Sequence, residues 1–505
     1  MKILMAASEA APFAKTGGLA DAVSALSLTL ANMGHEVRIV IPRYFVVDTE
    51  RYGLENLNLT LSSPMNNEVV KCAAWTANMP GSSKEKPVKI YFIEHNEFFG
   101  CREGFYGYDK EPDYFDNPRR FTFFSRVVFD LCRKLDWYPD ILHVHDWQAA
   151  LATVFLKYVE RKDGFEKTAS VLTIHNLGYQ GIYHKDNYPN TALGWDIFHQ
   201  AGFEDWNMMN FLKAGIHCAD KLNTVSPRYA EETKTQAFGF RLDSSLRYRA
   251  DDYIGILNGI DGKIWNPKTD PFIPRNYTVK PSKSEREKGI VNVATGKAAA
   301  KAALQKHYGL PENPNVPIIG LVTRLAEQKG MGELFGPSYG SAWSICRDME
   351  LQVVILGKGD SWCEHEVTSL ASRLSNFKAK IINSEDDSHL IEAGSDFFLM
   401  PSRYEPCGLN QMYSLVYGTL PIVRNTGGLA DTVENFSQDT GDGTGFMFDQ
   451  LNPRSIYDTV GWANWAYYNH RSQVEAMRVR AMKKDFSWEK SAEKYVEMYK
   501  AAFRK

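Results

Sequence analysis

Short runs of apolar and β-branched residues recur along the chain, and a turn and a helical pattern follow each of them. Continuous apolar strands that alternate with helices are typical of parallel sheets covered by helices on both faces. The runs that we expect to be strands are 2–6, 36–41, 141–144, 170–174, 318–322, 352–356 and 397–400. The pattern predicts an α/β protein with doubly wound, Rossmann-like sheets.

The length of the chain indicates two such sheets, because 505 residues exceed what one hydrophobic core usually organises. The strand-helix rhythm breaks over residues 262–316, which are rich in proline and contain a run of lysine and glutamate. We therefore expect a first domain over residues 1–261, a linker and the beginning of the second domain over 262–316, and a second Rossmann-like domain over 317–484. A central cleft is then expected between two domains that face each other.

Charge and cysteine content exclude several classes of partner. The 58 lysine and arginine residues nearly balance the 61 aspartate and glutamate residues, so neither a nucleic acid nor an anionic membrane surface is expected as a partner. The chain has no apolar run of about 20 residues and no secretory leader pattern. Its seven cysteines are dispersed and form no CxxC pair, which favours reduced thiols and a cytoplasmic protein.

A glycine turn with a neighbouring lysine follows the first expected strand. Gly17 and Gly18 begin a helical pattern, so backbone amides at the helix N-terminus can face an anion beside the charge of Lys15. The six residues from Thr16 recur as 426–431, where Thr426 precedes a second glycine pair, Gly427 and Gly428. A single glycine pair is more often only a tight turn. The repetition and the lysine favour anion binding.

Two cations follow the expected strand at 318–322. Arg324 and Lys329 would lie at the carboxyl end of that strand, where open α/β sheets bind their ligands, and they could stabilise a departing diphosphate. The alternative is a solvated loop in which these cations pair with Glu327. A carboxylate, Glu405, follows the strand at 397–400 and could accept hydrogen bonds from sugar hydroxyls, or could instead pair with Arg403.

Histidine and aromatic side chains follow two strands of the first domain. His143 and His145 share one face of a strand, but no further ligands occur at a characteristic spacing, so we expect no metal site. His175 ends the next strand, which suggests the wall of a cleft. Tyr106 and Trp147 could stack on sugar rings, although aromatic residues are more often part of the core.

Taken together, these motifs resemble the bacterial glycogen synthase and plant starch synthase family. The resemblance extends over nearly the whole chain and depends on KTGGLAD, HVHDW, TIHNLGYQG, FLKAGIHCAD, TRLAEQKG, PSRYEPCGLNQ and GTLPIVRNTGGLADTV, in this order. It implies the two-Rossmann-domain fold called GT-B and a final segment, 485–505, that crosses back to the first domain. It also implies glucose transfer from ADP-glucose, a co-substrate, to the non-reducing end of glycogen or another α-1,4-glucan, with retained configuration and without a metal or cofactor.

The same resemblance implies roles for individual residues, with the first domain on the acceptor side and the second on the donor side. The catalytic residues would be His175, Arg324, Lys329 and Glu405. The donor would contact Lys15, Gly18, Cys407, Gly408, Leu409, Asn410, Thr426, Gly427 and Gly428. The acceptor would contact Asp21, Tyr106, Asp146, Trp147 and Asn176.

The chain departs from the family pattern at two places near the expected nucleotide site. Asn410 replaces the usual threonine, and the segment 383–387 has no tyrosine where bacterial relatives often have one that stacks on adenine. Two alternatives follow from these departures. The donor could be UDP-glucose, or the chain could be a non-catalytic glucan-binding protein with the same fold.

Overall fold

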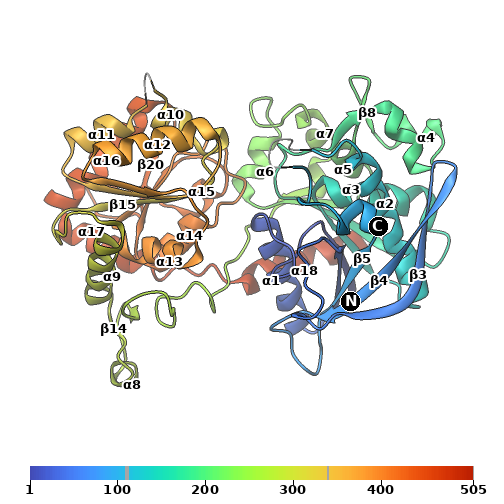
Figure 1. The fold of residues 1–505 in the computed structure, drawn as a ribbon, viewed down its shortest axis with the longest axis horizontal. Coiled ribbons are helices and arrows are strands. Elements are labelled where there is room, and N and C mark those ends of the chain that lie inside the picture. The colour runs from blue at the N-terminus through green and yellow to red at the C-terminus, as the bar shows by residue number, and fades with distance from the viewer. Residues whose placement is uncertain (109–112, 338–339, 504–505) are drawn as a thin grey trace. The chain divides into compact units, whose positions relative to one another are not determined.

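The structure of the protein is a computed structural model, and it describes residues 1–108, 113–337 and 340–503. The chain divides into two compact units, shown in Figure 1. The first contains Met1–Gly259 and the C-terminal segment that begins at Trp488, and the second contains Ile260–Ser487. These limits lie within three residues of the domain boundaries expected from the sequence.

The first unit is built around a mainly parallel sheet. Its strands are β1 (Lys2–Ala6), β2 (Glu36–Pro42), β3 (Glu55–Met65), β4 (Glu68–Asn78), β5 (Lys89–Glu94), β6 (Ile141–His145), β7 (Ala169–Ile174), β11 (Lys221–Thr224) and β12 (Tyr253–Gly255). Within the described residues the order is β12-β11-β7-β6-β1-β2-β5-β4-β3, and all pairs from β12 to β5 are parallel. The order reverses between β1 and β6, which makes this the switch point of a Rossmann-like sheet.

Helices and a small second sheet complete the first unit. The helices are α1 (Gly18–Asn32), α2 (Asn117–Lys134), α3 (Asp146–Phe155), α4 (Trp195–Gln200), α5 (Phe211–Cys218), α6 (Pro227–Thr233), α7 (Asp243–Tyr248) and α18 (Trp488–Phe503). The small antiparallel sheet consists of β8 (Ile182–His184), β9 (Glu204–Asp205) and β10 (Met208–Asn210). The C-terminal helix α18 packs against α1 and β7, and Figure 1 shows it beside α1. Its amphipathic sequence buries Tyr495 and Tyr499 against this unit.

The second unit has a fully parallel sheet. Its strands are β15 (Ile318–Val322), β16 (Gln352–Leu356), β17 (Phe377–Lys380), β18 (Phe397–Met400), β19 (Leu420–Arg424) and β20 (Phe446–Phe448). Across the described part of the chain their spatial order is β17-β16-β15-β18-β19-β20, which is the 3-2-1-4-5-6 order of the Rossmann fold. The switch point lies between β15 and β18. The prediction of two doubly wound Rossmann-like domains is confirmed, and all seven expected strands are present.

The segment expected to be a linker belongs to the second unit. It contains the short pair β13 (Tyr277–Thr278) and β14 (Val291–Asn292), and the helices α8 (Lys283–Glu287) and α9 (Val293–Tyr308). Helix α9 buries Leu304 and Tyr308 in a cluster with β15, β16 and β18. The remaining helices are α10 (Met331–Phe335), α11 (Ala342–Asp348), α12 (Ser361–Arg373), α13 (Glu385–Gly394), α14 (Asn410–Val416), α15 (Gly427–Thr432), α16 (Pro453–Asn469) and α17 (Arg471–Ala481), with a 3-10 turn η5 (Glu327–Lys329).

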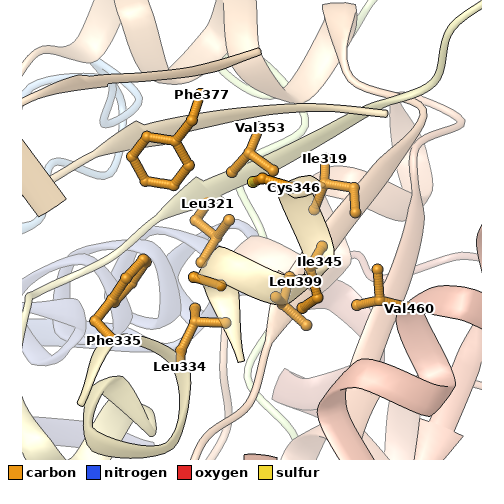
Figure 2. A pocket seen from close by; sticks show the side chains of 11 residues that line it. Ile319, Leu321, Leu334, Phe335, Ile345, Cys346, Val353, Phe377, Leu399 and Val460 are labelled. Carbon is orange, nitrogen blue, oxygen red and sulfur yellow. The ribbon is translucent and has the colours of Figure 1, made fainter. Parts of the chain in front are cut away.

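The core of the second unit contains a small apolar cavity, shown in Figure 2. Its volume is about 10 Å³, and side chains such as Leu321, Phe335 and Phe377 line it. This is close to the space that one water molecule needs, and the lining side chains offer almost no polar partners to a water molecule. The cavity is a packing defect of the core and is too small for a sugar or a nucleotide.

Candidate functional site

Two loops at the switch point of the second unit pack closely together. One follows β15 and contains η5, and the other follows β18. The backbone N–H of Arg403 donates to the carbonyl oxygen of Gln328 at 2.8 Å. Gly330 has φ +73°, and a Cβ atom there would lie 1.9 Å from the carbonyl oxygen of Pro401. Only glycine allows this approach, so the two loops form one surface where α/β sheets bind ligands.

This surface brings together two of the expected catalytic residues. Lys329 Nζ lies 2.6 Å from Glu405 Oε2, and the Ser402 hydroxyl donates to the same oxygen at 2.9 Å. The Glu405 side chain is only 6% exposed, so its charge depends on Lys329 and Ser402 for compensation. Glu405 therefore pairs with Lys329, whereas Arg403 pairs with Glu333 at 2.6 Å and lies 3.6 Å from Glu327.

The third expected catalytic residue of this unit is exposed. Arg324 follows β15 by two residues and donates to Gln328 Oε1 at 3.3 Å, a contact within its own loop. A single long hydrogen bond to a neutral amide at the surface restrains a guanidinium weakly. Arg324 can therefore reorient toward an anion at the carboxyl end of β15, whereas Lys329 is already engaged by a carboxylate.

The glycine pair at 427–428 has a different environment from its counterpart at 17–18. Gly428 donates its N–H to the carbonyl oxygen of Glu405 at 3.0 Å, and its hypothetical Cβ would lie 1.9 Å from the carbonyl oxygen of Cys407. Gly427 has φ +46° and approaches Glu405 equally closely. Both glycines are buried with Thr426, and α15 has only six residues. The Gly428 amide therefore holds the Glu405 loop in place, and the expected anion contact at this helix end stays a prediction.

The residues after Glu405 form the turn into α14. Cys407 is buried, Gly408 has φ +69°, and Leu409 immediately precedes the helix. The Asn410 amide donates to the carbonyl oxygen of Val322, the last residue of β15, at 2.6 Å. The amide that departs from the family pattern therefore ties α14 to the end of the central strand.

The switch point of the first unit is formed by the loops after β1 and β6. Helix α1 begins at Gly18, and beyond the chain neighbours of Gly17 no atom of the described residues lies within 4 Å of a Cβ built on it, so this helix end is open to the extent that the structure describes it. Lys15 Nζ lies 2.8 Å from Asp21 Oδ1, and both side chains are exposed, at 52% and 37%. The first glycine pair thus retains the geometry of an anion site, with a lysine held beside it by a weak surface ion pair.

Glu9 organises this loop and was missed by the sequence reasoning. It is 3% exposed and follows the end of β1. The Thr16 hydroxyl donates to Glu9 Oε1 at 2.6 Å, and the Thr16 N–H donates to Oε2. The Tyr106 hydroxyl lies 2.5 Å from Glu9 Oε1 and 2.8 Å from Ser8 Oγ, and burial next to Glu9 raises the pKa of Tyr106. Tyr106 therefore supports the glycine loop through Glu9. A carboxylate three residues after the first expected strand, within a run of small residues, was the available signal in the sequence.

The expected histidine and aspartate of the first unit also come together. Asp146 begins α3 with φ +54°, a conformation that is uncommon for residues other than glycine. Its Oδ1 accepts the N–H of His175 at 2.6 Å and that of Asn176 at 3.5 Å. His145 Nδ1 lies 3.0 Å from His175 Nε2. His145 at the end of β6 and Asp146 directly after it thus hold the ring and the backbone of His175, which follows β7.

Burial raises the pKa of the Asp146 carboxyl to about 7, despite the amides that it accepts. The protonated form is then favoured in the folded chain, so this group's contribution to stability falls as pH rises from about 4 to about 7. Asp146→Asn removes this dependence. We expect the variant to gain up to about 4 kcal/mol in stability relative to the wild type over that range. Thermal unfolding at a series of pH values measures this gain.

The control for this pH series is Gln236→Asn, since Gln236 is an exposed residue and neither its amide nor the new one titrates. Its difference in unfolding temperature from the wild type should not vary with pH. A difference for Asp146→Asn that is equally constant would show that the Asp146 carboxyl ionises normally in the folded chain.

Trp147 lies in the aromatic core of the first unit. Its ring centroid is 4.9 Å from that of Phe121, and a Cβ atom on Gly181 would lie 2.5 Å from the indole. The side chain is 6% exposed, which agrees with the core alternative and leaves its face unavailable for stacking on a sugar. Across the three described ranges, no group of three or more histidine, cysteine or carboxylate residues could hold a metal ion. No helix in those ranges is long and apolar enough to cross a membrane.

Comparison with known proteins matches both halves of the chain to families of sugar-transferring enzymes. Residues 2–248 match the family model described as the starch synthase catalytic domain, and residues 304–463 match that of glycosyl transferases group 1. The chain is 52% identical to the glycogen synthase of Treponema denticola over 505 residues, covering 100% of this chain and 99% of the relative. It is 44% identical to glycogen synthase 1 of Geobacter sulfurreducens over 510 residues, covering 100% and 97%.

Solved structures resemble the fold. The catalytic domain of starch synthase IV from Arabidopsis thaliana, bound to ADP and acarbose, superposes with a TM-score of 0.87 at 31% identity, covering 100% of this chain and 99% of that one. Sucrose-phosphate synthase from Thermosynechococcus elongatus has a TM-score of 0.57 at 15% identity, with the same coverage. At this identity the likeness concerns only the fold. Fold and matches together define a glycosyltransferase with two Rossmann-like domains. The chain belongs to the glycogen and starch synthase family.

Proposed function

We propose that this glycosyltransferase uses ADP-glucose as its donor and extends the non-reducing ends of an α-1,4-glucan with retained configuration. The observation that carries the proposal is the Lys329–Glu405 pair at the Rossmann switch point of the second unit. In the starch synthase IV relative, the same fold binds ADP together with acarbose. A lysine suits a diphosphate oxygen, and a buried carboxylate suits the hydroxyls of the transferred sugar.

In the proposed mechanism, charge stabilisation and positioning supply most of the rate enhancement. Arg324 and Lys329 neutralise the charge that develops on the departing diphosphate, and Glu405 holds the donor glucose. Lys15 and the open helix end at Gly17 would supply further positive potential to the diphosphate. The acceptor hydroxyl attacks the same face of the sugar, and a phosphate oxygen of the leaving group takes its proton. No metal or cofactor is part of this proposal.

The non-catalytic alternative has little support in the site. Its main basis was the replacement of threonine by Asn410, and the structure gives this amide a role in joining α14 to β15. Lys15, Arg324, Lys329 and Glu405 are all present.

The seven cysteines all lie in the described residues and form no disulfide, which supports the further proposal of a cytoplasmic enzyme.

Initial rates of glucose incorporation into glycogen, measured in parallel with ADP-glucose and UDP-glucose, test the donor. We expect kcat/KM to be at least about tenfold higher with ADP-glucose, which corresponds to about 1.4 kcal/mol of discrimination. Equal or higher kcat/KM with UDP-glucose would reject ADP-glucose as the donor. Glycogen binding without incorporation from either nucleotide sugar would favour the non-catalytic alternative.

A further inference from the structure

Three histidines of the first unit form a cluster that includes the expected catalytic residue His175. His143 and His145 lie on β6 with ring centroids 4.2 Å apart, and the ring centroid of His145 is 5.3 Å from that of His175. His143 and His145 are 0% and 1% exposed, whereas His175 is only partly buried. Burial lowers the pKa of all three imidazoles. Each ring is therefore neutral and carries one N–H.

The hydrogen bonds of His143 determine where its proton lies. Thr173 uses its own hydroxyl hydrogen to donate to Asn223 Oδ1 at 2.7 Å. His143 Nε2, which lies 2.6 Å from Thr173 Oγ1, must then be the donor in that contact. Its Nδ1 accepts from the Tyr499 hydroxyl on α18 at 2.8 Å. Both nitrogens of His143 are thereby satisfied, and it needs nothing from His145.

Only one of the two ring nitrogens of His145 has a hydrogen-bond partner among the described residues. Its Nδ1 lies 3.0 Å from His175 Nε2, and its Nε2 is buried without a hydrogen-bond partner among the described residues. If His145 carried its proton on Nε2, a buried N–H would have no acceptor, which is rarer and more costly than an unused acceptor. The favourable arrangement has the proton on His145 Nδ1, which then donates to His175 Nε2.

We propose that His145 is a positioning residue that fixes the tautomer of His175. Because Nε2 of His175 accepts from His145, the single proton of His175 lies on Nδ1. His175 is the least buried residue of the three, so this N–H is the one left to meet a ligand. The N–H of His175 is then a neutral donor suited to a sugar or phosphate oxygen, with its backbone held by Asp146 at 2.6 Å. This role rests on the proposed function.

Substitution of His145 by phenylalanine and by asparagine tests the proposal. His145→Phe keeps the ring shape but has no proton to donate, and we expect kcat to fall about 10- to 100-fold, as when one positioned donor is disturbed. His145→Asn places an amide N–H near the position of Nδ1 and should restore kcat to within about threefold of the wild type.

His143→Phe is the matched control, since His143 is equally buried on the same strand and makes no hydrogen bond to His175. It should lower the unfolding temperature without the loss of kcat. If His145→Asn is no more active than His145→Phe, or if His145→Phe keeps more than half of the wild-type kcat, the positioning role is rejected.

The tautomer of His175 can also be measured directly by NMR. This measurement depends neither on catalysis nor on variants that fold well. Two-bond ¹H–¹⁵N spectra of the ¹⁵N-histidine-labelled wild-type protein, without substrate, report which nitrogen of each of the 12 histidines is protonated. The signal of His175 is assigned by its absence in His175→Asn. Protonation at Nδ1 is expected, and protonation at Nε2 overturns the inference. A wild-type protein that shows the Nδ1 form but transfers no glucose would instead reject the proposed function.

Discussion

Lys329→Ala is expected to lower the turnover of glucose transfer about 100- to 1000-fold, the usual effect of removing one donor that stabilises developing charge. Lys329 lies 2.6 Å from a carboxylate that is only 6% exposed, so the variant loses the diphosphate contact and also leaves Glu405 without its cation. Steady-state kinetics with ADP-glucose and glycogen measure the loss. Arg324→Ala should have an effect of similar size, because Arg324 acts on the same leaving group.

Arg403→Ala is the matched control for these two variants. Arg403 is a cation of the same pair of loops, but its guanidinium pairs with Glu333 at 2.6 Å and not with the expected donor residues. We expect its turnover to change less than about threefold, and circular dichroism should show all three variants to be folded. If purified Lys329→Ala turned over at a near-normal rate, the assignment of Lys329 to the leaving group would be wrong.

Lys15→Gln should raise the KM for the donor about 10- to 100-fold, since a hydrogen bond to a charged group contributes about 1.5–3 kcal/mol. In the free protein Lys15 pairs with Asp21 at the surface, a contact that is weak enough to be exchanged for a phosphate oxygen. Affinity for glycogen should not change, because the lysine is assigned to the donor. Donor kinetics and co-sedimentation with glycogen measure the two effects separately.

The control is Lys162→Gln, an identical charge change at an exposed lysine outside the helices and strands. It should leave both donor KM and glycogen binding at wild-type values. Donor kinetics of Lys15→Gln that match those of Lys162→Gln would remove the glycine loop at 15–18 from the donor site. A parallel loss of glycogen affinity would move the loop to the acceptor side.

Within the described residues, local sequence patterns predicted seven of the fifteen strands of the two large sheets, including both strands at each switch point. The buried strands have continuous apolar runs, as in β15 and β16, and these can be recognised without knowledge of their neighbours. The hairpin of β3 and β4 was missed because it lies at the sheet edge, where burial alternates along Glu55–Met65 and no continuous run occurs. Helix α9 was missed because prolines lie on both sides of it, and these prolines led us to interpret 262–316 mainly as a linker.

The partners within the site could not be derived from the sequence. Lys329 and Glu405 meet because β15 and β18 are neighbours, and this depends on the strand order of the folded sheet. The two TGGLAD copies are identical in sequence, yet a Cβ atom on Gly17 would meet no described atom within 4 Å beyond its chain neighbours, whereas one on Gly427 would lie 1.9 Å from the carbonyl oxygen of Glu405. Neighbouring segments far away in the chain decide that difference. Closure of the two units around the donor stays a prediction.

The most direct test of the account is the product formed from ADP-glucose and a short α-1,4-linked maltooligosaccharide. Proton NMR of the anomeric region identifies the new linkage, and labelling shows which end of the acceptor is extended. We predict a single new α-1,4-linked glucose at the non-reducing end, with formation abolished or slowed at least about 100-fold in Lys329→Ala. A β-linked product, extension at the reducing end, or glucan binding without any transfer would contradict the central claim of a retaining, ADP-glucose-dependent glucosyltransferase.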